Sequence, residues 1–557
     1  MKSMFLRSLL ALAAAAIVFP CLAETPSALA ARSSRTAGRE SKAVLRRVRP
    51  ANVGSAMAER AIVSAAGPER MAARGAETHP DQGPKPLQTR AAWVPLVNQM
   101  PDTNDSLVTP GAVLLLTDGT VLAQDSGTAD WWRLTPDQFG SYVNGTWIQA
   151  ASMPYAPLYF ASAVLPDGRV LVEGGEYVDF VFTWTNQGAI YDPVTDTWQS
   201  IAPPAGWATI GDAQSVVLAN GTLMLANALT AESALFDAST LTWSITGSGK
   251  ADINDEEGWT LLSSGKVLTV DANNFSDITH SELYDPALGA WSFAGSTGVS
   301  LVDIGPGSQS SHEIGPQVLR PDGTVIVAGA TGHTAIYDSK TGAWAAGPDF
   351  PSTIDGQLDV ADGPAALLPN GNVLIAASPG IFQNGTRFFE FDGRRLTEAA
   401  SRPDAADASS FSFYSLILPT GEILVNNSTS GIGAMVYTGG GAFRHEWAPE
   451  ISSVPRSLHA GASYQLMGER LNGLSQGAGY GDDSQSATNY PLVRITNQQT
   501  GHVFFARTHD HSSMAVGLQT HGSTQFDVPA GIETGPSQLT VVTNGIPSES
   551  VRVTIAP

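Results

Sequence analysis

From residue 91 onward, short apolar runs alternate with glycine-containing turns, and the pattern recurs about every fifty residues. In each unit one apolar run enters the turn and a second run, rich in β-branched residues, leaves it. Asn, Asp and Gly tolerate the positive φ of tight β-turns, so this pattern predicts repeated β-hairpins. The turns are Asp118-Gly119, Asp167-Gly168, Asn220-Gly221, Ser264-Gly265, Asp322-Gly323, Asn370-Gly371 and Thr420-Gly421.

A third and a fourth strand follow most hairpins. The third ends in an aromatic residue and Asp, and a Trp opens the fourth. The clearest copies are Tyr191-Asp192 with Trp198, Phe236-Asp237 with Trp243, Tyr284-Asp285 with Trp291, and Tyr337-Asp338 with Trp344. Four strands per unit and seven units predict an all-β fold, a seven-bladed kelch-type β-propeller over residues 91–447. Stacking between neighbouring blades explains the aromatic residues. The strand around Trp93 is expected to pair with the last blade and close the ring.

The repeat stops after Trp447. Residues 448–557 consist of short predicted strands and turns, ending in Leu539–Val542 and Val551–Ile555. This pattern predicts an immunoglobulin-like β-sandwich.

The N-terminus has the features of a secretory signal peptide. Lys2 and Arg7 precede an apolar run from Leu9 to Phe19, and Ala23 is a suitable cleavage site. We therefore expect residues 1–23 to be a signal peptide and the protein to be secreted, periplasmic or extracellular. No later run is long enough for a transmembrane helix, so no such anchor is expected.

Residues 24–90 hold 12 basic and 6 acidic residues and have no apolar periodicity. They are expected to be a disordered basic linker or pro-segment. The alternative is a basic arm that contacts an anionic surface.

Charge and cysteine content exclude two classes of protein. The formal net charge is −22, from 30 Lys+Arg and 52 Asp+Glu, which argues against nucleic acid as a partner. The single cysteine, Cys21, lies in the predicted signal peptide, so no disulfide framework is expected. We expect a monomer.

The predicted architecture resembles the galactose oxidase and glyoxal oxidase family. The segment Tyr159–Val170, followed by Gly174-Gly175, looks like the family's inner-strand signature. The stretch from Tyr490–Arg494 through Thr508-His509 looks like its last domain.

This resemblance implies copper and a Tyr radical cross-linked to Cys, acting on alcohols or aldehydes. Tyr159 matches the cross-linked Tyr, and His509 matches the His that the last domain carries into the propeller channel. The Cys position falls near Thr109–Ala112, which has no thiol, and the family's Tyr-His pair falls at Phe411-Ser412. The Cys-Tyr radical cofactor is therefore not expected.

The starts of the innermost strands form a second pattern. Counting eight residues back from each turn gives Pro110, Tyr159, Asp212, Glu256, Ile314, Asp362 and Ser412, with Glu313 one residue away. Equivalent positions face one another across a propeller channel, so several carboxylates should converge at one acidic mouth. Converging carboxylates bind a hard cation such as Ca²⁺ or raise a pKa for acid/base work, and paired carboxylates also serve glycoside hydrolysis. The alternative is a solvated acidic rim.

Glu256, Glu313 and His312 are the candidate catalytic residues at this mouth, with Tyr159 added by the family resemblance. Candidate substrate-binding residues are Asp212, Asp255, Asp362, Trp259 and Trp207, the two Trp as stacking faces for a sugar.

The last predicted domain holds His502, His509, His511 and His521. On a strand, His509 and His511 would share one face and could hold Zn²⁺ or Cu²⁺ with a further ligand. The alternative is a His-rich loop packed against the propeller. If the family geometry holds, His509 reaches the acidic mouth.

Three functions remain open. The leading hypothesis is a secreted galactose oxidase-like protein that lacks the radical cofactor and engages carbohydrate at the acidic mouth. The alternatives are a copper-dependent alcohol or aldehyde oxidase with unusual ligands, and a non-enzymatic cell-surface interaction protein. A divalent metal, Ca²⁺ or Cu²⁺, is the candidate cofactor.

Overall fold

The computed structural model describes residues 91–101, 109–304, 311–429, 432–482 and 484–557. The predicted signal peptide and basic segment lie outside these ranges. Regular structure in the described ranges consists of β-strands and the short 3-10 helices η2 (Ala405–Asp407), η3 (Ser410–Ser412) and η4 (His445–Trp447). No helix in these ranges has the length and apolar character needed to cross a bilayer. The all-β class is confirmed.

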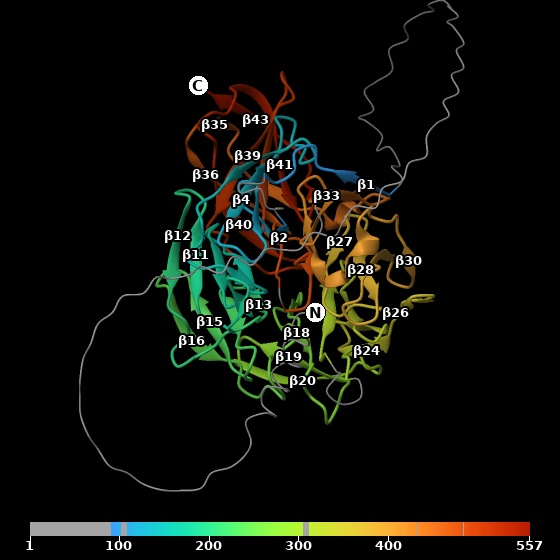
Figure 1. The fold of residues 1–557 in the computed structure, drawn as a ribbon. Helices are drawn as coiled ribbons and strands as arrows, with labels where there is room; N and C mark the ends of the chain where they lie inside the picture. The colour runs from blue at the N-terminus through green and yellow to red at the C-terminus, as the bar shows by residue number, and fades with distance from the viewer. Residues whose placement is uncertain (1–90, 102–108, 305–310, 430–431, 483) are drawn as a thin grey trace, which may run out of the picture. The chain divides into compact units, whose positions relative to one another are not determined.

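Most strands before residue 440 belong to antiparallel sheets that follow one another along the chain (Figure 1). The first three are β2 (Pro110–Leu115), β3 (Val121–Asp125), β4 (Trp131–Thr135) and β5 (Thr146–Gln149); β7 (Ala161–Val164), β8 (Val170–Glu173), β11 (Gly188–Asp192) and β12 (Thr197–Ile201); and β13 (Ser215–Val217), β14 (Leu223–Ala226), β15 (Ser233–Asp237) and β16 (Thr242–Thr246). The next two are β17 (Thr260–Leu261), β18 (Val267–Val270), β19 (His280–Asp285) and β20 (Ala290–Ser296); and β21 (Ile314–Leu319), β22 (Thr324–Gly329), β23 (Thr334–Asp338) and β24 (Ala343–Ala346).

The last two sheets of this series are more elaborate. One contains β27 (Ala365–Leu367), β28 (Val373–Pro379), β29 (Arg387–Phe391) and β30 (Leu396–Glu398), extended by β25 (Ser352–Thr353), β26 (Gly356–Asp359) and β37 (Ala478–Gly479). The other contains β31 (Phe413–Ile417), β32 (Ile423–Asn427), β33 (Met435–Thr438) and β1 (Ala92–Pro95). A small separate sheet is formed by β6 (Pro157–Leu158), β9 (Tyr177–Val178) and β10 (Val181–Phe182).

The sheets form a closed, propeller-like ring. The first strand of each sheet contacts that of the next, in the order β2, β7, β13, β17, β21, β27 and β31, and β31 contacts β2 again. At the end of the series β1 pairs with β33, with Trp93 opposite Tyr437, so the pairing expected of the Trp93 segment is observed. In Figure 1 the blue strand β1 lies beside β33.

Burial explains the sequence pattern of the strands. β8 and β14 are buried at every position because sheets pack against both faces, and they read as continuous apolar runs. The outer strand β12 is mostly exposed, although Trp198 packs on Tyr191 with ring centroids 5.0 Å apart. Trp198 also lies 5.4 Å from Trp131 of the preceding sheet. The repeated aromatic residues therefore join strands and neighbouring sheets.

The C-terminal strands form a further sheet arrangement with its own apolar core, which includes Leu466, Val493 and Val541. These strands are β34 (Glu450–Ser453), β35 (Ser457–His459), β36 (Ser463–Glu469), β38 (Leu492–Asn497), β39 (Val503–His509), β40 (His521–Asp527), β41 (Gly535–Thr543), β42 (Ile546–Pro547) and β43 (Val551–Ala556). The arrangement contacts the hairpin-turn end of the ring, where the Thr508 amide donates to the Thr117 carbonyl at 3.1 Å.

One C-terminal segment enters the ring itself. This channel segment, residues 474–482 and 484–488, connects β36 to β38 and contains β37, which pairs with β27. Gln476 accepts a hydrogen bond from the Leu261 amide at 2.7 Å, and Gln485 accepts one from the Ser162 amide at 2.9 Å. Because these partners belong to innermost strands on different sides of the ring, the channel segment fills its centre.

Candidate functional site

Three carboxylates meet where the innermost strands begin. Glu256, Glu313 and Asp362 precede β17, β21 and β27, and one oxygen from each lies within 4.8 Å of the others. All three residues are buried, with at most 4% of their surface exposed. We call this group the carboxylate centre. The expected convergence of carboxylates is thus observed for these residues, but in a buried setting rather than a solvated rim.

The backbone turns sharply at this level of the ring. Tyr159, Glu256, His312 and Asp362 have φ values between 55° and 64°, in the left-handed region that non-glycine residues rarely adopt. Such conformations cost on the order of 1 kcal/mol each and are frequent at functional sites. The turn at Glu256 also points its amide at the channel segment, where it donates to Asp482 at 3.1 Å. The C-terminal part of the chain thus brings a fourth carboxylate to this region.

The carboxylate centre is electrostatically unfavourable without a proton or a cation. Burial raises the pKa of Glu256 well above its usual value, and the negative charges of Asp255 and Asp212 raise it further. A side-chain hydrogen bond with Glu313 opposes this rise. Carboxylates at such short separation cannot all ionise without a shared positive charge. A shared proton or a positive charge would stabilise the carboxylate centre.

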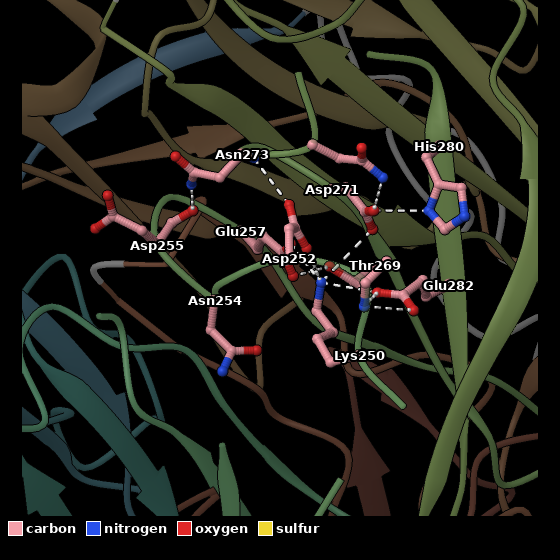
Figure 2. A network of polar contacts seen from close by, with 12 residues as sticks. Lys250, Asp252, Asn254, Asp255, Glu257, Thr269, Asp271, Asn273, His280 and Glu282 are labelled. Carbon is pink, nitrogen blue, oxygen red and sulfur yellow. Dashed lines mark hydrogen bonds and ion pairs between the residues drawn. The ribbon is translucent and has the colours of Figure 1, made fainter. Parts of the chain in front are cut away.

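A second acidic cluster surrounds one buried lysine (Figure 2). The Lys250 ammonium lies 2.8 Å from both Glu257 and Glu282 and 3.6 Å from Asp271, and it also donates to Asp252. None of these side chains is more than 6% exposed. We call this group the lysine cage. These carboxylates together raise the pKa of Lys250, although burial opposes the rise.

One asparagine connects the lysine cage to the acidic mouth. The Asn273 amide donates to Asp252 at 2.9 Å, and its side chain donates to the Asp255 carbonyl at 2.8 Å. The Asn273 side-chain oxygen lies 3.2 Å from Nδ1 of His312. Figure 2 shows Asn273 between Asp252 of the lysine cage and Asp255.

Sequence reasoning missed the role of Lys250 and of its partners Asp271 and Glu282. A signal was present, because Lys250 is the only basic residue between positions 170 and 265 and adjoins the most acidic run of the chain. Asp271, which directly follows β18, and Glu282, on β19, had no comparable signal.

The two tryptophans expected to stack on a sugar do not offer an exposed face. Trp259 is 8% exposed and packs against Trp291, with ring centroids 5.5 Å apart. Trp207 is 6% exposed and belongs to the main hydrophobic core. This expectation was wrong because both rings fill space between strands. The ring of Tyr159 is by contrast half-buried, and its centroid lies 6.0 Å from that of the half-buried Tyr177.

The expectation that His509 reaches the acidic mouth is also wrong. His509 ends β39, between Asp510 at 2.9 Å and Asp527 at 3.2 Å. The neighbouring His511 amide donates to the Pro166 carbonyl, at the hairpin turn that ends the innermost strand beginning near Tyr159. At about 3.3 Å per residue, that strand separates the two levels by roughly 20 Å.

His509 and His511 do not share a face, because Asp510 between them has a φ of 50° and interrupts the strand. His511 is buried against Tyr490 and bonds Thr524 through Nδ1 at 2.9 Å. Burial, with a smaller contribution from His509, lowers the pKa of His511 to about 3. Within the described ranges, neither histidine belongs to a group of three metal-binding side chains with adjacent ligand atoms.

The positions that the family resemblance assigns to further copper ligands lie at strand starts in the ring. Phe411 and Ser412 form part of η3 before β31, and Phe411 packs edge-on against Phe382 with centroids 5.5 Å apart. Thr109 directly precedes β2, and Pro110–Ala112 are its first residues.

Asp359 near the mouth should make stability depend on pH. Burial, followed by the negative charge of Asp303, raises the pKa of Asp359 to about 8. Because the native state binds this proton more tightly than the unfolded state, stability should fall as pH rises from about 4 to 8. Asp359→Asn should therefore match the wild type at pH 4 and exceed it at pH 8, by about 1.4 kcal/mol per unit of pKa difference. Urea unfolding at several pH values measures this, with the exposed Asp355→Asn as the control; parallel curves for Asp359→Asn and wild type would contradict the expectation.

Comparison with known proteins identifies local and distant similarities. No family model matches this chain. The chain is 38% identical to the Kelch-like protein terF of Aspergillus terreus (strain NIH 2624 / FGSC A1156) over 79 residues, which are 14% of this chain and 17% of that protein. The chain thus matches under a fifth of that relative's length, and the match supports the kelch character of the repeats.

Solved structures similar to this chain include a fungal alcohol oxidase of the AA5 family in complex with copper, with 12% identity, a TM-score of 0.46, and coverage of 84% of this chain and 100% of that one. Virginiamycin B lyase from Staphylococcus aureus has 8% identity and a TM-score of 0.42, covering 63% of this chain and 99% of that one. The WD40 propeller domain of Doa1 has 11% identity and a TM-score of 0.40, covering 62% and 97%.

Proposed function

We propose that this chain is a secreted galactose oxidase-like protein, with a seven-bladed kelch-type propeller and an immunoglobulin-like C-terminal domain, that binds a hard divalent cation at its carboxylate centre. The observation that carries this proposal is the convergence of buried oxygens from Glu256, Glu313 and Asp362 within 4.8 Å. Asp482 of the channel segment, bonded to the Glu256 amide, is a further oxygen donor beside them.

The donor set favours Ca²⁺, Mg²⁺ or Mn²⁺ over copper. Carboxylates suit hard cations, whereas copper sites in proteins use imidazole or sulfur ligands. Phe411 and the segment Thr109–Ala112 offer neither, and Ser412 offers only a hydroxyl. The imidazole of His312 is engaged with Asn273 at 3.2 Å. We therefore infer that the Cys-Tyr radical cofactor of the family is absent, and no redox step is assigned.

Carbohydrate is the proposed partner at this site. Ca²⁺ takes six to eight oxygen ligands, so three or four carboxylates leave positions for water or for substrate hydroxyls. The half-buried ring of Tyr159, which precedes β7 as Glu256 precedes β17, lies 6.0 Å from the ring of Tyr177. The ring of Phe182 lies 5.7 Å from that of Tyr177, so these three residues form an aromatic row. A sugar would bind the cation through its hydroxyls, and this aromatic row would offer it a stacking face.

Metal binding by the purified protein tests the proposal. We expect isothermal titration and elemental analysis to find one Ca²⁺ or Mn²⁺ per chain. Glu256→Gln should lower the metal affinity on the order of 100-fold or more, because loss of a metal ligand costs at least as much as loss of a residue that hydrogen-bonds to a ligand. The exposed Glu398→Gln serves as the matched control and should bind normally. Glycan-array binding that requires the cation would support the carbohydrate partner.

Other outcomes would favour the alternatives. Stoichiometric copper with peroxide release from alcohols would overturn the assignment in favour of an oxidase. Absence of both cation and glycan binding would leave the cell-surface interaction protein. Mass spectrometry of the mature N-terminus and sedimentation analysis would test secretion and the proposed monomer separately.

A further inference from the structure

The lysine cage has the oxygen arrangement of a metal site but contains a side-chain ammonium. We propose that Lys250 is a tethered substitute for a divalent cation, and that the cage binds a hard cation of the Ca²⁺ class when the ammonium is removed. This site is separate from the carboxylate centre, and its test does not depend on the proposed function.

The oxygens come from different parts of one sheet and converge on a single point. Asp252 and Glu257 lie on the segment before β17, Asp271 directly follows β18, and Glu282 lies on β19. Two overlapping groups of three ligand atoms within 4.8 Å occur here, Asp252 with Glu257 and Asp271, and Asp271 with His280 and Glu282. Hard divalent cations prefer such carboxylate-rich sets.

One oxygen of the cage is incompletely satisfied by the lysine. The Asp271 side chain is fully buried, and its Oδ1 accepts no hydrogen bond among the described residues while it points at the ammonium from 3.6 Å. Its other oxygen is engaged by His280 at 2.6 Å and Asn274 at 3.0 Å. Hydrogen-bond geometry limits an ammonium to three donors, whereas a metal ion accepts six or more oxygens. A spherical cation would satisfy Oδ1 as well.

Charge balance leads to the same conclusion. One ammonium faces four carboxylates within a volume that excludes water, so negative charge is in excess. Burial raises the pKa of Glu257 against the opposing effect of Lys250, and the negative charges of Asp252 and Asp271 raise it further. A divalent ion would neutralise one more charge than Lys250 does.

A surface groove adjoins the residue that fills the cage. A groove of about 550 Å³ is lined by Lys250 together with Glu232, Gly249 and Leu288. Removal of the lysine side chain would open the cage toward this groove.

Trp291 provides a specific optical probe. Its ring lies 5.8 Å from the Lys250 ammonium, so a Tb³⁺ ion in that position would be excited through the indole. Tb³⁺ replaces Ca²⁺ in oxygen-rich sites because both are hard ions of similar preference. Luminescence that depends on Trp291 would therefore report an ion beside this indole, and the ion counts separate the cage from the carboxylate centre.

The experiment compares Lys250→Ala with the wild type. The variant should bind one more divalent ion per chain than the wild type, should gain thermal stability on addition of Ca²⁺, and should show Tb³⁺ luminescence at least tenfold above the wild type. Trp291→Phe in the Lys250→Ala background should remove the luminescence but retain the ion. If the carboxylate centre binds no ion, the wild type should bind none and Lys250→Ala should bind one. The ion counts therefore test the two proposals independently.

Lys266→Ala, which removes an exposed lysine from the same sheet, is the matched control and should bind no additional ion. Should Lys250→Ala not fold without metal, refolding in Ca²⁺ should recover it. The double variant Lys250→Ala/Glu282→Gln carries one carboxylate fewer and retains Asp252, Glu257 and Asp271. Equal ion counts in the variants and the wild type, or failure of both variants to fold in millimolar Ca²⁺, would overturn the proposal.

Discussion

Lys250→Met should lower the free energy of unfolding by about 3–5 kcal/mol, because it leaves four buried carboxylates without their counter-charge. Methionine retains most of the aliphatic volume, so the loss reports charge rather than a cavity. The midpoint and the slope of urea denaturation at pH 7 give the change in the free energy of unfolding.

The pH dependence of this deficit identifies its cause. Without the ammonium, the cage carboxylates bind protons more tightly in the native state than in the unfolded state, so the variant should recover stability as pH falls from 7 to 5. The matched variant Lys266→Met removes an exposed pair with Asp285 at 3.1 Å and should cost less than about 1 kcal/mol at either pH. A deficit that does not change with pH would contradict a charge-based role for Lys250.

Arg402→Met should also cost about 3–5 kcal/mol, since it breaks a buried ion pair and leaves carbonyl groups unsatisfied. The guanidinium is fully buried and bonds Asp404 at 2.6 Å. It also donates to the carbonyls of Val425 at 2.7 Å and Gly433. Its face lies 5.9 Å from the ring of Trp93, the residue that anchors β1.

Hydrogen exchange separates this effect from general destabilisation. In Arg402→Met the amides of β1 should exchange faster than those of β14, on the far part of the ring, because loosening begins where the ring closes. Arg387→Met, in the same sheet region but with 38% side-chain exposure and a 3.4 Å pair to Glu398, should change stability by less than about 1 kcal/mol. Uniform acceleration across all strands would argue against a local role at the closure.

The repeat in the sequence was sufficient to predict residues whose position in the ring depends on the repeat alone. Counting back from the turns placed Glu256 and Asp362 at equivalent levels of the two sheets that flank the β21 sheet, and the structure brings them together with Glu313. The same repeat located the strand around Trp93 at the end of the ring. Both predictions succeeded because every unit has the same strand order. The position of a residue in one unit therefore predicts the height along the ring axis of the equivalent residues in the other units.

Contacts between distant, non-repeating segments were beyond that reasoning. Hydrophobicity alone did not distinguish Trp259 as a core residue from a ligand-facing one, since both environments favour an indole ring. Which C-terminal segment enters the channel depends on how the C-terminal strands pack against the hairpin turns. In this fold Asp482, and not His509, reaches the mouth. The role of Lys250 could not be predicted, because two of its four partners are Asp271, directly after β18, and Glu282, on β19.

The pairing of β1 with β33 has a consequence for the order in which the chain matures. Gln99, just after β1, bonds Ala434 across 335 residues of sequence, so a ribosome completes nearly the whole ring before its first strand finds its partner. Contacts this distant fold slowly, because loop closure must precede any stabilising gain. Until then β33 presents an unpaired edge, a site where strands of other chains could add. The residues of β1 must therefore remain unpaired while the rest of the ring is synthesised. Any factor that binds them would delay the pairing of β1 with β33, which closes the ring.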